Sequence, residues 1–163
     1  MSNETTKNEK ISHRNSARIA AVQALYEIDV TGAPVDSVLG EFMTQRWKNA
    51  SKDDDGTPIE LPSFDKELLK DIIEGVSEGQ GEFDTLIAEK LSAPWTMERL
   101  ELLVRAILRA GTYELVRRID IPKRVVINEY VNVAHAFFVE NEPSMINGVL
   151  DKLAQEIRVH EKK

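Results

Sequence analysis

Apolar residues recur at helical intervals in the first third of the chain. Ser12 belongs to a residue type that caps helices, and the pattern that follows it lasts until Thr31-Gly32. The spacing predicts a helix from residue 12 to about residue 31, preceded by a disordered polar tail over residues 1–11. The apolar positions that repeat along this helix are Ile19, Val22, Leu25 and Tyr26.

A second helix is predicted from Val35 to about Lys48, and an acidic loop follows it over residues 49–62. The loop reads NASKDDDGTPIELP and combines prolines, a glycine and an acidic run. Proline and glycine interrupt regular structure, and neighbouring like charges repel each other. We therefore expect a solvated connection there.

The middle of the chain contains two further helical patterns separated by glycines. Ser63 is a candidate cap for a helix whose apolar stripe reaches Val76. Three glycines within residues 75–81 predict a hinge between helices. Helical spacing then resumes at Phe83 and ends at Pro94.

Prolines also delimit the last three predicted helices. Thr96 is a candidate cap for a long helix that stops before Pro122, because the residue before a proline avoids the α region. The next helix is expected to follow Pro122, and Pro143 is expected to open the last one, since proline suits the first turn of a helix. In total the pattern predicts about seven helices joined mostly by short loops.

No useful stretch of the sequence alternates apolar and polar residues, and no internal repeat is found. The pattern therefore predicts a single all-α domain over residues 12–160. A chain of 163 residues is long enough to bury such a core without covalent cross-links. Zero cysteines exclude disulfides and thiolate metal sites, and no apolar run reaches the length of a membrane span, so we expect a cytoplasmic protein.

The sequence does not predict catalytic chemistry, a metal site or a cofactor. The three histidines, His13, His135 and His160, lie far apart and do not form a metal-ligand motif. The glycines of residues 75–81 lack the lysine and the hydroxyl residue of a phosphate loop. We therefore expect a protein that is not an enzyme.

Basic residues cluster at two places although the net charge is −7 and the acidity is concentrated between residues 31 and 100. His13, Arg14 and Arg18 occupy the opening turns of the first predicted helix, where the helix dipole is already positive and favours anions. One interpretation is an anion-binding face, and the other is a solubilising helix start. The second cluster either joins the first into one basic surface or consists of snorkelling side chains and charges that suit helix C-termini. It comprises Arg105, Arg109, Arg117, Arg118, Lys123 and Arg124.

Three blocks of sequence resemble the NusB family of bacterial transcription antitermination factors. They are ARIAAVQALYEID near the start, AILRAGTYELVRRIDIPKRVVINEYVNVAHAFF at 106–138 and INGVLDKLAQEIR at 146–158. Their order and spacing fit that family from residue 12 to residue 158. The resemblance implies two packed three-helix bundles, over about 12–80 and 81–160, and a non-enzymatic role.

The resemblance also implies partners. NusB-like proteins pair with NusE, a small-subunit ribosomal protein, and the pair binds the single-stranded boxA element of nascent ribosomal RNA transcripts. This complex acts with RNA polymerase and promotes processive transcription of ribosomal RNA operons. The sequence leaves open whether two copies of the chain form a homodimer, and a protein-only helical adaptor or self-associating bundle remains the alternative function.

Carried over position by position, the resemblance assigns two sets of site residues. Arginines bind phosphates or stack on bases, and amide side chains hydrogen-bond base edges. Acidic side chains suit a basic ribosomal partner. The RNA-binding set is His13, Arg14, Arg18, Gln23, Arg109, Arg124, Asn141, Ser144 and Met145, and the NusE-binding set is Tyr26, Glu98 and Glu101.

Three polar residues lie among apolar neighbours in the last two predicted helices. They are Asn128, Glu129 and Asn147. Buried polar groups are usually hydrogen-bonded, so we expect them to form a buried network that ties the two helices together. The alternative is direct contact with RNA.

Overall fold

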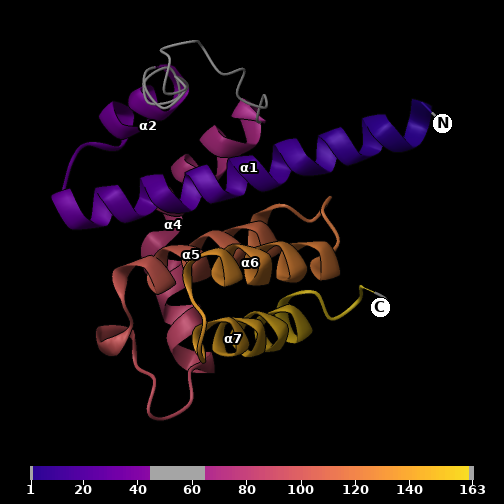
Figure 1. Ribbon diagram of the computed structural model, residues 1–163. Coiled ribbons are helices and arrows are strands. Elements are labelled where there is room, and N and C mark those ends of the chain that lie inside the picture. The colour runs from indigo at the N-terminus through magenta and orange to yellow at the C-terminus, as the bar shows by residue number, and fades with distance from the viewer. Residues whose placement is uncertain (1, 45–64, 162–163) are drawn as a thin grey trace. The chain divides into compact units, whose positions relative to one another are not determined.

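The computed structural model describes residues 2–44 and 65–161, and within them it contains six α-helices, one short 3₁₀ helix and no strand (Figure 1). The expected all-α class is confirmed. The predicted acidic loop over residues 49–62, the cap at Ser63 and the end of the second helix near Lys48 lie outside the described residues. The chain divides into two compact units, and the boundary lies between Ile73 and Glu74.

The first unit contains α1 (Ser2–Thr31), α2 (Val35–Thr44) and the beginning of α4 (Lys66–Lys90). The sequence predicted a helix start at Ser12 and a disordered tail over 1–11, but α1 is helical from Ser2. No glycine or proline interrupts residues 2–31, so a helix nucleated in the apolar half extends through the polar half at little cost.

The core face of α1 is built mainly from alanines. Val22 and Leu25 are buried as the spacing predicts, whereas Tyr26 is 41% exposed. Small side chains on one face allow neighbouring backbone to approach closely, which an apolar count based on large residues does not reveal. The buried alanines of α1 are Ala17, Ala20, Ala21 and Ala24.

The helix α4 starts with a side-chain cap and bends at a glycine. Asp65 Oδ1 accepts the backbone N–H of Leu68 at 3.0 Å, so Asp65 occupies the N-cap position. The predicted hinge over 75–81 is a kink within one continuous helix, at Gly79, where the backbone leaves helical geometry (φ −109°, ψ 15°). The patterns expected to form two helices therefore form α4.

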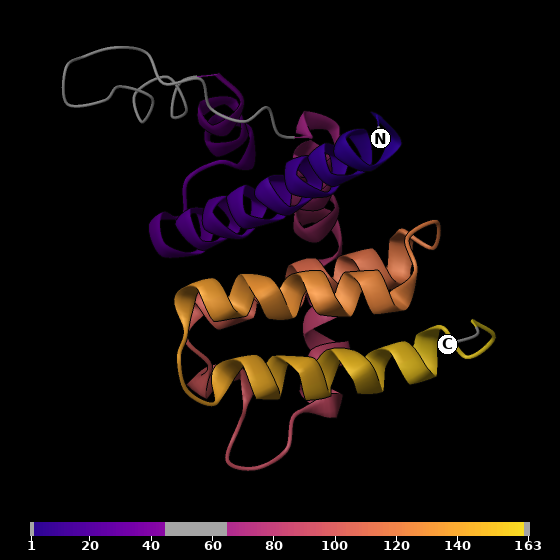
Figure 2. The ribbon, with the colours of Figure 1, turned by 45° about the vertical axis from the view of Figure 1, so that its right-hand side comes forward.

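The second unit holds the rest of α4, the 3₁₀ turn η1 (Met97–Arg99), α5 (Leu102–Arg117), α6 (Lys123–Phe137) and α7 (Glu142–Ile157). The last three helices contact one another, and α6 and α7 run side by side in opposite directions (Figure 2). The helix predicted from Thr96 to Pro122 is thus shorter, since η1 precedes it. Pro122 and Pro143 mark helix starts as expected.

α5 forms the centre of this unit, because every residue from Ala106 to Leu115 is buried. Its surroundings are tightly packed: a Cβ atom added at Gly75 would lie 2.1 Å from the Tyr113 ring. Phe83 packs edge-on against the same ring, with 6.1 Å between ring centroids. α4 and α5 therefore approach through a glycine and two aromatic side chains.

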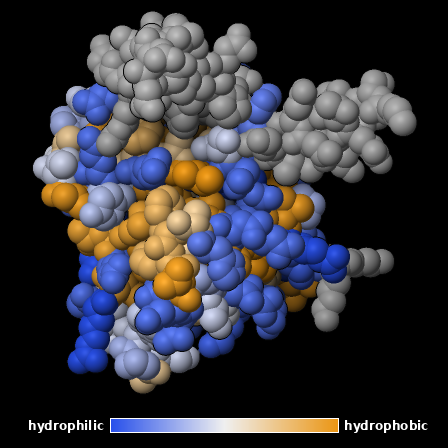
Figure 3. Space-filling model, viewed as in Figure 1, coloured by the Kyte–Doolittle hydropathy of each residue, from blue (hydrophilic) through white to orange (hydrophobic). Residues whose placement is uncertain are grey.

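The surface is mixed rather than apolar. On the face drawn in Figure 3, hydrophilic residues are interspersed with apolar ones. The most exposed large apolar side chains belong to different segments, as for Val30, Ile119, Val139 and Val159. Scattered apolar residues of this kind are ordinary for a folded protein.

Candidate nucleic-acid interface

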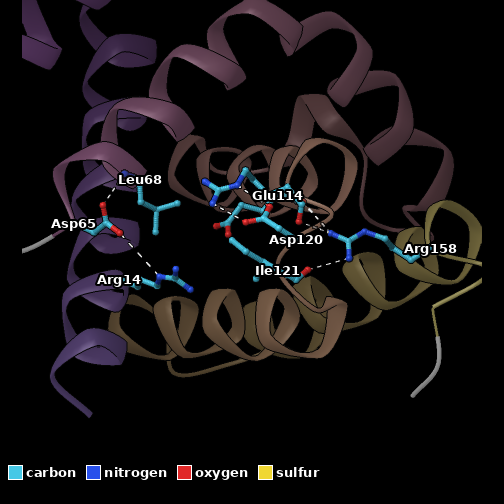
Figure 4. Close-up of polar contacts among 8 residues, drawn as sticks. Arg14, Asp65, Leu68, Glu114, Asp120, Ile121 and Arg158 are labelled. Atoms are coloured by element: carbon cyan, nitrogen blue, oxygen red, sulfur yellow. Dashed lines mark hydrogen bonds and ion pairs between the residues drawn. The ribbon is translucent and has the colours of Figure 1, made fainter. Parts of the chain in front are cut away.

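Arg14 projects from α1 beside the start of α4 (Figure 4). Its side chain is 51% exposed, and its Nε atom lies 4.0 Å from Asp65 Oδ2. The backbone N–H of Asp65 also donates to the His13 carbonyl oxygen at 3.2 Å, which fixes this carboxylate next to α1. An ion pair of this length and exposure is weak, so the Arg14 guanidinium can exchange Asp65 for another anion.

Arg18 differs from Arg14 although the two residues are one helical turn apart. Arg18 is only 1% exposed, and it interacts with other residues of the protein. It continues the buried face of Ala17, Val22 and Leu25, although both interpretations of the sequence required it to be accessible. The burial argues against the predicted direct contact of Arg18 with RNA.

Arg109 is likewise committed to an internal contact. Its Nε and Nη2 atoms donate to the two carboxylate oxygens of Asp84 at 2.7 and 2.9 Å, and the residue is 7% exposed. A two-point arginine–carboxylate pair is among the stronger hydrogen-bonded contacts in proteins. Arg109 therefore joins α5 to α4, and the structure argues against its predicted contact with RNA.

Most cations of the RRIDIPKR turn are also engaged. Arg117 Nη2 lies 2.8 Å from Glu82, and Arg118 donates two 3.0 Å bonds to Asp120. Lys123 Nζ donates to the Glu161 carbonyl oxygen at 3.0 Å. Arg124 is different, because it is exposed and has no polar partner among the described residues.

The start of α7 presents the remaining predicted RNA residues. Asn141 and Ser144 are exposed, and Met145 is half-buried. Asn141 holds the N-cap position without a side-chain cap bond, and its carbonyl oxygen accepts the Met145 N–H at 3.0 Å. The first N–H groups of a helix lack partners within the helix, so this end favours an anion.

Other predicted site residues lie at the surface of their own units. Gln23 is exposed and His13 is half-buried on α1. The predicted NusE-binding residues are exposed as well: Tyr26 on α1, Glu98 in η1 and Glu101 at the N-cap of α5. Their carboxylates are therefore accessible to a partner.

The predicted buried network of Asn128, Glu129 and Asn147 is wrong. Asn128 and Asn147 are exposed, and Glu129 is only half-buried. The buried polar pair instead joins α5 to α6, where the Tyr130 hydroxyl donates to the Glu114 carboxylate and both residues are 0% exposed. Periodicity places Glu114 inside an apolar stripe, and that was the available sequence signal.

Sequence reasoning also missed a third buried arginine. Arg158 at the end of α7 donates to the carbonyl oxygens of Leu115, Ile121, Glu114 and Arg118 at 2.7 to 3.1 Å, and to Glu161 Oε2 at 2.5 Å. Figure 4 shows its contacts with Glu114 and Ile121. It thereby satisfies carbonyl groups at the end of α5. An arginine close to a chain end carries no sequence signal for such a role.

The described residues form an all-helical protein whose exposed arginine, asparagine and serine side chains can bind an anionic partner. Within residues 2–44 and 65–161, no helix is long and apolar enough to cross a membrane. The model of the NusB family matches residues 15–155. The chain belongs to the NusB family.

Relatives support this assignment over most of their length. The transcription antitermination protein NusB of Rhodopseudomonas palustris is 44% identical over 146 residues, which cover 90% of this chain and 81% of that protein. The protein of the same name from Allorhizobium ampelinum is 42% identical over 163 residues, covering 95% and 97%.

Solved structures share the fold. T. maritima NusB matches with a TM-score of 0.70 and 29% identity, covering 88% of this chain and 91% of that one. A crystal structure of the antitermination factors NusB and NusE in complex with double-stranded RNA matches with a TM-score of 0.69, 23% identity and coverages of 89% and 98%. At that identity the second likeness shows the fold alone.

Proposed function

We propose that this protein is a bacterial transcription antitermination factor that pairs with NusE and binds the boxA element of nascent ribosomal RNA. Its role is non-enzymatic and cytoplasmic: the pair promotes processive transcription by RNA polymerase. The observation that carries the proposal is the family match over residues 15–155. The relatives that are 44% and 42% identical to this chain are both named transcription antitermination protein NusB, and they support the role.

The RNA contacts come from exposed polar side chains in both units. Arg14 and Arg124 supply guanidinium groups that bind phosphates or stack on bases, and Gln23, Asn141 and Ser144 supply hydrogen-bonding groups for base edges. His13 precedes Arg14 on α1, and Met145 follows Ser144 on α7, so both belong to the same proposed RNA-binding segments. Arg18 and Arg109 position the helices instead, because both are buried.

Binding of RNA depends on the partner protein. With Arg18 and Arg109 buried, Arg14 and Arg124 are the exposed arginines of the proposed RNA-binding set, and the net charge of the chain is −7, so its own attraction for phosphates is small. A basic ribosomal protein supplies the missing charge. Tyr26, Glu98 and Glu101 form its docking residues, since an exposed aromatic side chain and two exposed carboxylates complement a basic surface.

A gel-shift assay with boxA RNA, with and without NusE, tests the proposal. We expect a ternary complex at moderate salt and weak binding by either protein alone. A scrambled RNA of the same length is the control for sequence preference. The absence of a ternary complex, together with unchanged light scattering on addition of RNA, would instead favour the protein-only adaptor.

A further inference from the structure

A groove between α6 and α7 contains polar side chains that the internal packing does not use. It has a volume of about 540 Å³, and its walls include Arg124, Val125 and Asn128 of α6 and Asn147 and Asp151 of α7. This volume lies within the range of small-molecule and nucleotide sites. All the lining residues belong to the second unit, so the groove is formed by one compact body.

Two amide side chains from neighbouring helices line this groove, Asn128 from α6 and Asn147 from α7. Neither amide side chain has a hydrogen-bond partner in the described part of the chain, and both residues are exposed. Each amide offers two donors and an acceptor. They therefore form a pair of hydrogen-bonding groups available to a ligand.

The carboxylate of Asp151 is oriented beside them. Gln155 Nε2 donates to Asp151 Oδ2 at 3.0 Å, which holds the carboxylate on the groove side of α7. An ionised carboxylate only accepts hydrogen bonds, so it selects a ligand that presents N–H groups. The groove thus combines one acceptor-only group with two amides.

The charges in the groove favour a base over a phosphate. Lys123 hydrogen-bonds Glu161 through both its backbone N–H and its Nζ atom, which leaves Arg124 as the exposed cation among the described lining residues, together with the carboxylate of Asp151. The groove is then close to neutral and gains little from phosphate charge. Val125, which is 40% exposed, and Ile127 provide an apolar surface for the face of a ring.

On α7, the groove begins at Asn147, close to the helix start where Asn141 and Ser144 are proposed to contact RNA. Ser144, Asn147 and Asp151 are exposed at positions i, i+3 and i+7 of this helix, so they share one face. A strand bound at Ser144 can therefore place its next base at Asn147.

We propose that the α6–α7 groove binds one unpaired guanine of the single-stranded RNA. The guanine N1–H and N2 amino group donate to Asp151, and the amide N–H groups of Asn128 and Asn147 donate to O6 and N7. Arg124 contacts the flanking phosphate. This inference rests on the proposed function and adds a base-specific site to it.

Nuclear magnetic resonance on the labelled full-length chain tests the groove directly. The probes are the oligonucleotides UUUGUUU, UUUIUUU, in which inosine lacks the N2 amino group, and UUUAUUU. We expect the side-chain amide signals of Asn128 and Asn147 to shift with the guanine probe, with binding about tenfold weaker for inosine because one of two paired hydrogen bonds is lost. Asn132, exposed on α6 but outside the groove, is the internal control.

A substitution sharpens the assignment without touching the core. Asp151 is exposed, so Asp151→Ala should fold normally. Because alanine offers no acceptor to the N2 amino group, this variant should bind guanine and inosine probes with equal affinity. Asn132→Ala should keep the tenfold difference. Retained discrimination by Asp151→Ala would overturn the proposed contact.

The outcomes separate this site from the general function. If RNA shifts the backbone signals of Asn141 and Ser144 but not the two groove amides, the groove proposal is wrong and RNA binding stands. If NusE alone shifts the groove amides, the groove is a peptide-binding site and the guanine proposal is overturned. If no probe shifts any signal and no ternary complex forms with boxA RNA and NusE, both proposals fail.

Discussion

Each unit of the molecule contains a carboxylate that accepts a helix-start N–H and pairs with an arginine from another helix. In the first unit Asp65 accepts the Leu68 N–H and lies 4.0 Å from Arg14. In the second unit Glu161 accepts the Lys123 N–H at 2.7 Å and binds Arg158 at 2.5 Å. The two arginines have different surroundings.

The Arg14 side chain is 51% exposed, whereas that of Arg158 is 5% exposed and donates to four carbonyl oxygens besides Glu161. Solvent screens the first pair, so its arginine is available to a ligand. Burial and full hydrogen bonding tie the second to the fold. Similar pairs therefore leave the arginine accessible in one unit and hold it within the fold in the other.

The largest expected effect is on Arg158. Arg158→Met should lower the free energy of unfolding by about 3–5 kcal/mol, because it leaves buried carbonyls and Glu161 without their donor. Urea denaturation followed by circular dichroism measures it. Arg14→Met is the matched control and should cost less than about 1 kcal/mol. Equal losses of unfolding free energy in the two variants would show that the two arginines do not differ in their contribution to stability.

The second effect is the pH dependence contributed by Glu161. The hydrogen bond from the Lys123 backbone N–H, helped by Arg158, lowers the pKa of Glu161 below its usual value of 4.5. The ionised carboxylate therefore stabilises the fold fully above that value, and the stabilisation is lost as the pH falls through the lower folded pKa.

Unfolding free energies measured from neutral pH down to about pH 3 test this dependence. The native chain should lose more stability on acidification than Glu161→Gln, which has no charge to lose. Parallel curves for the two proteins would show that Glu161 does not contribute in this way.

The third effect concerns RNA rather than stability. Arg14→Ala should weaken binding of boxA RNA to the complex with NusE and make the salt dependence shallower by about 0.7 in the slope of log affinity against log salt, as expected for one lost phosphate contact on a single strand. Fluorescence anisotropy over a salt series measures both quantities. An unchanged slope would exclude a phosphate contact by Arg14.

The smallest expected effect is an increase in RNA affinity when the charge of Asp65 is removed. Asp65→Asn keeps a side chain that caps helices well but removes the negative charge beside Arg14. RNA affinity should rise about two- to fivefold, since exposed ion pairs contribute up to about 1 kcal/mol. The melting temperature should stay nearly unchanged. Weaker RNA binding by this variant would mean that Asp65 positions Arg14 for RNA instead of competing for it.

The sequence predicted the helix boundaries that rest on local chemistry. The start of α2 at Val35, the boundary at Pro122 and the start of α7 next to Pro143 all agree with the structure. Proline restricts its own backbone and that of its neighbour wherever it occurs, so such signals are independent of the rest of the fold. The start of α1 lacked a signal of this kind and was placed ten residues too late.

The candidate site was less predictable. Arg14 and Arg18 have the same residue type and lie on one helical face, yet one is exposed and the other is 1% exposed. Arg109 was predicted to contact RNA, but in the folded protein it binds Asp84, which lies 25 residues earlier in the chain. Asn128 and Asn147 looked buried because their neighbours are apolar, but they line an open groove.

Local patterns thus determine that this chain is all-helical, where most of its helices start, and which family it resembles. Whether a given arginine binds RNA or holds the protein together depends on which carboxylates and carbonyls approach it in space. Those partners lie up to 44 residues away in the chain, as Glu114 does from Arg158. Burial and pairing set the energy of a charge, and both are properties of the packed molecule.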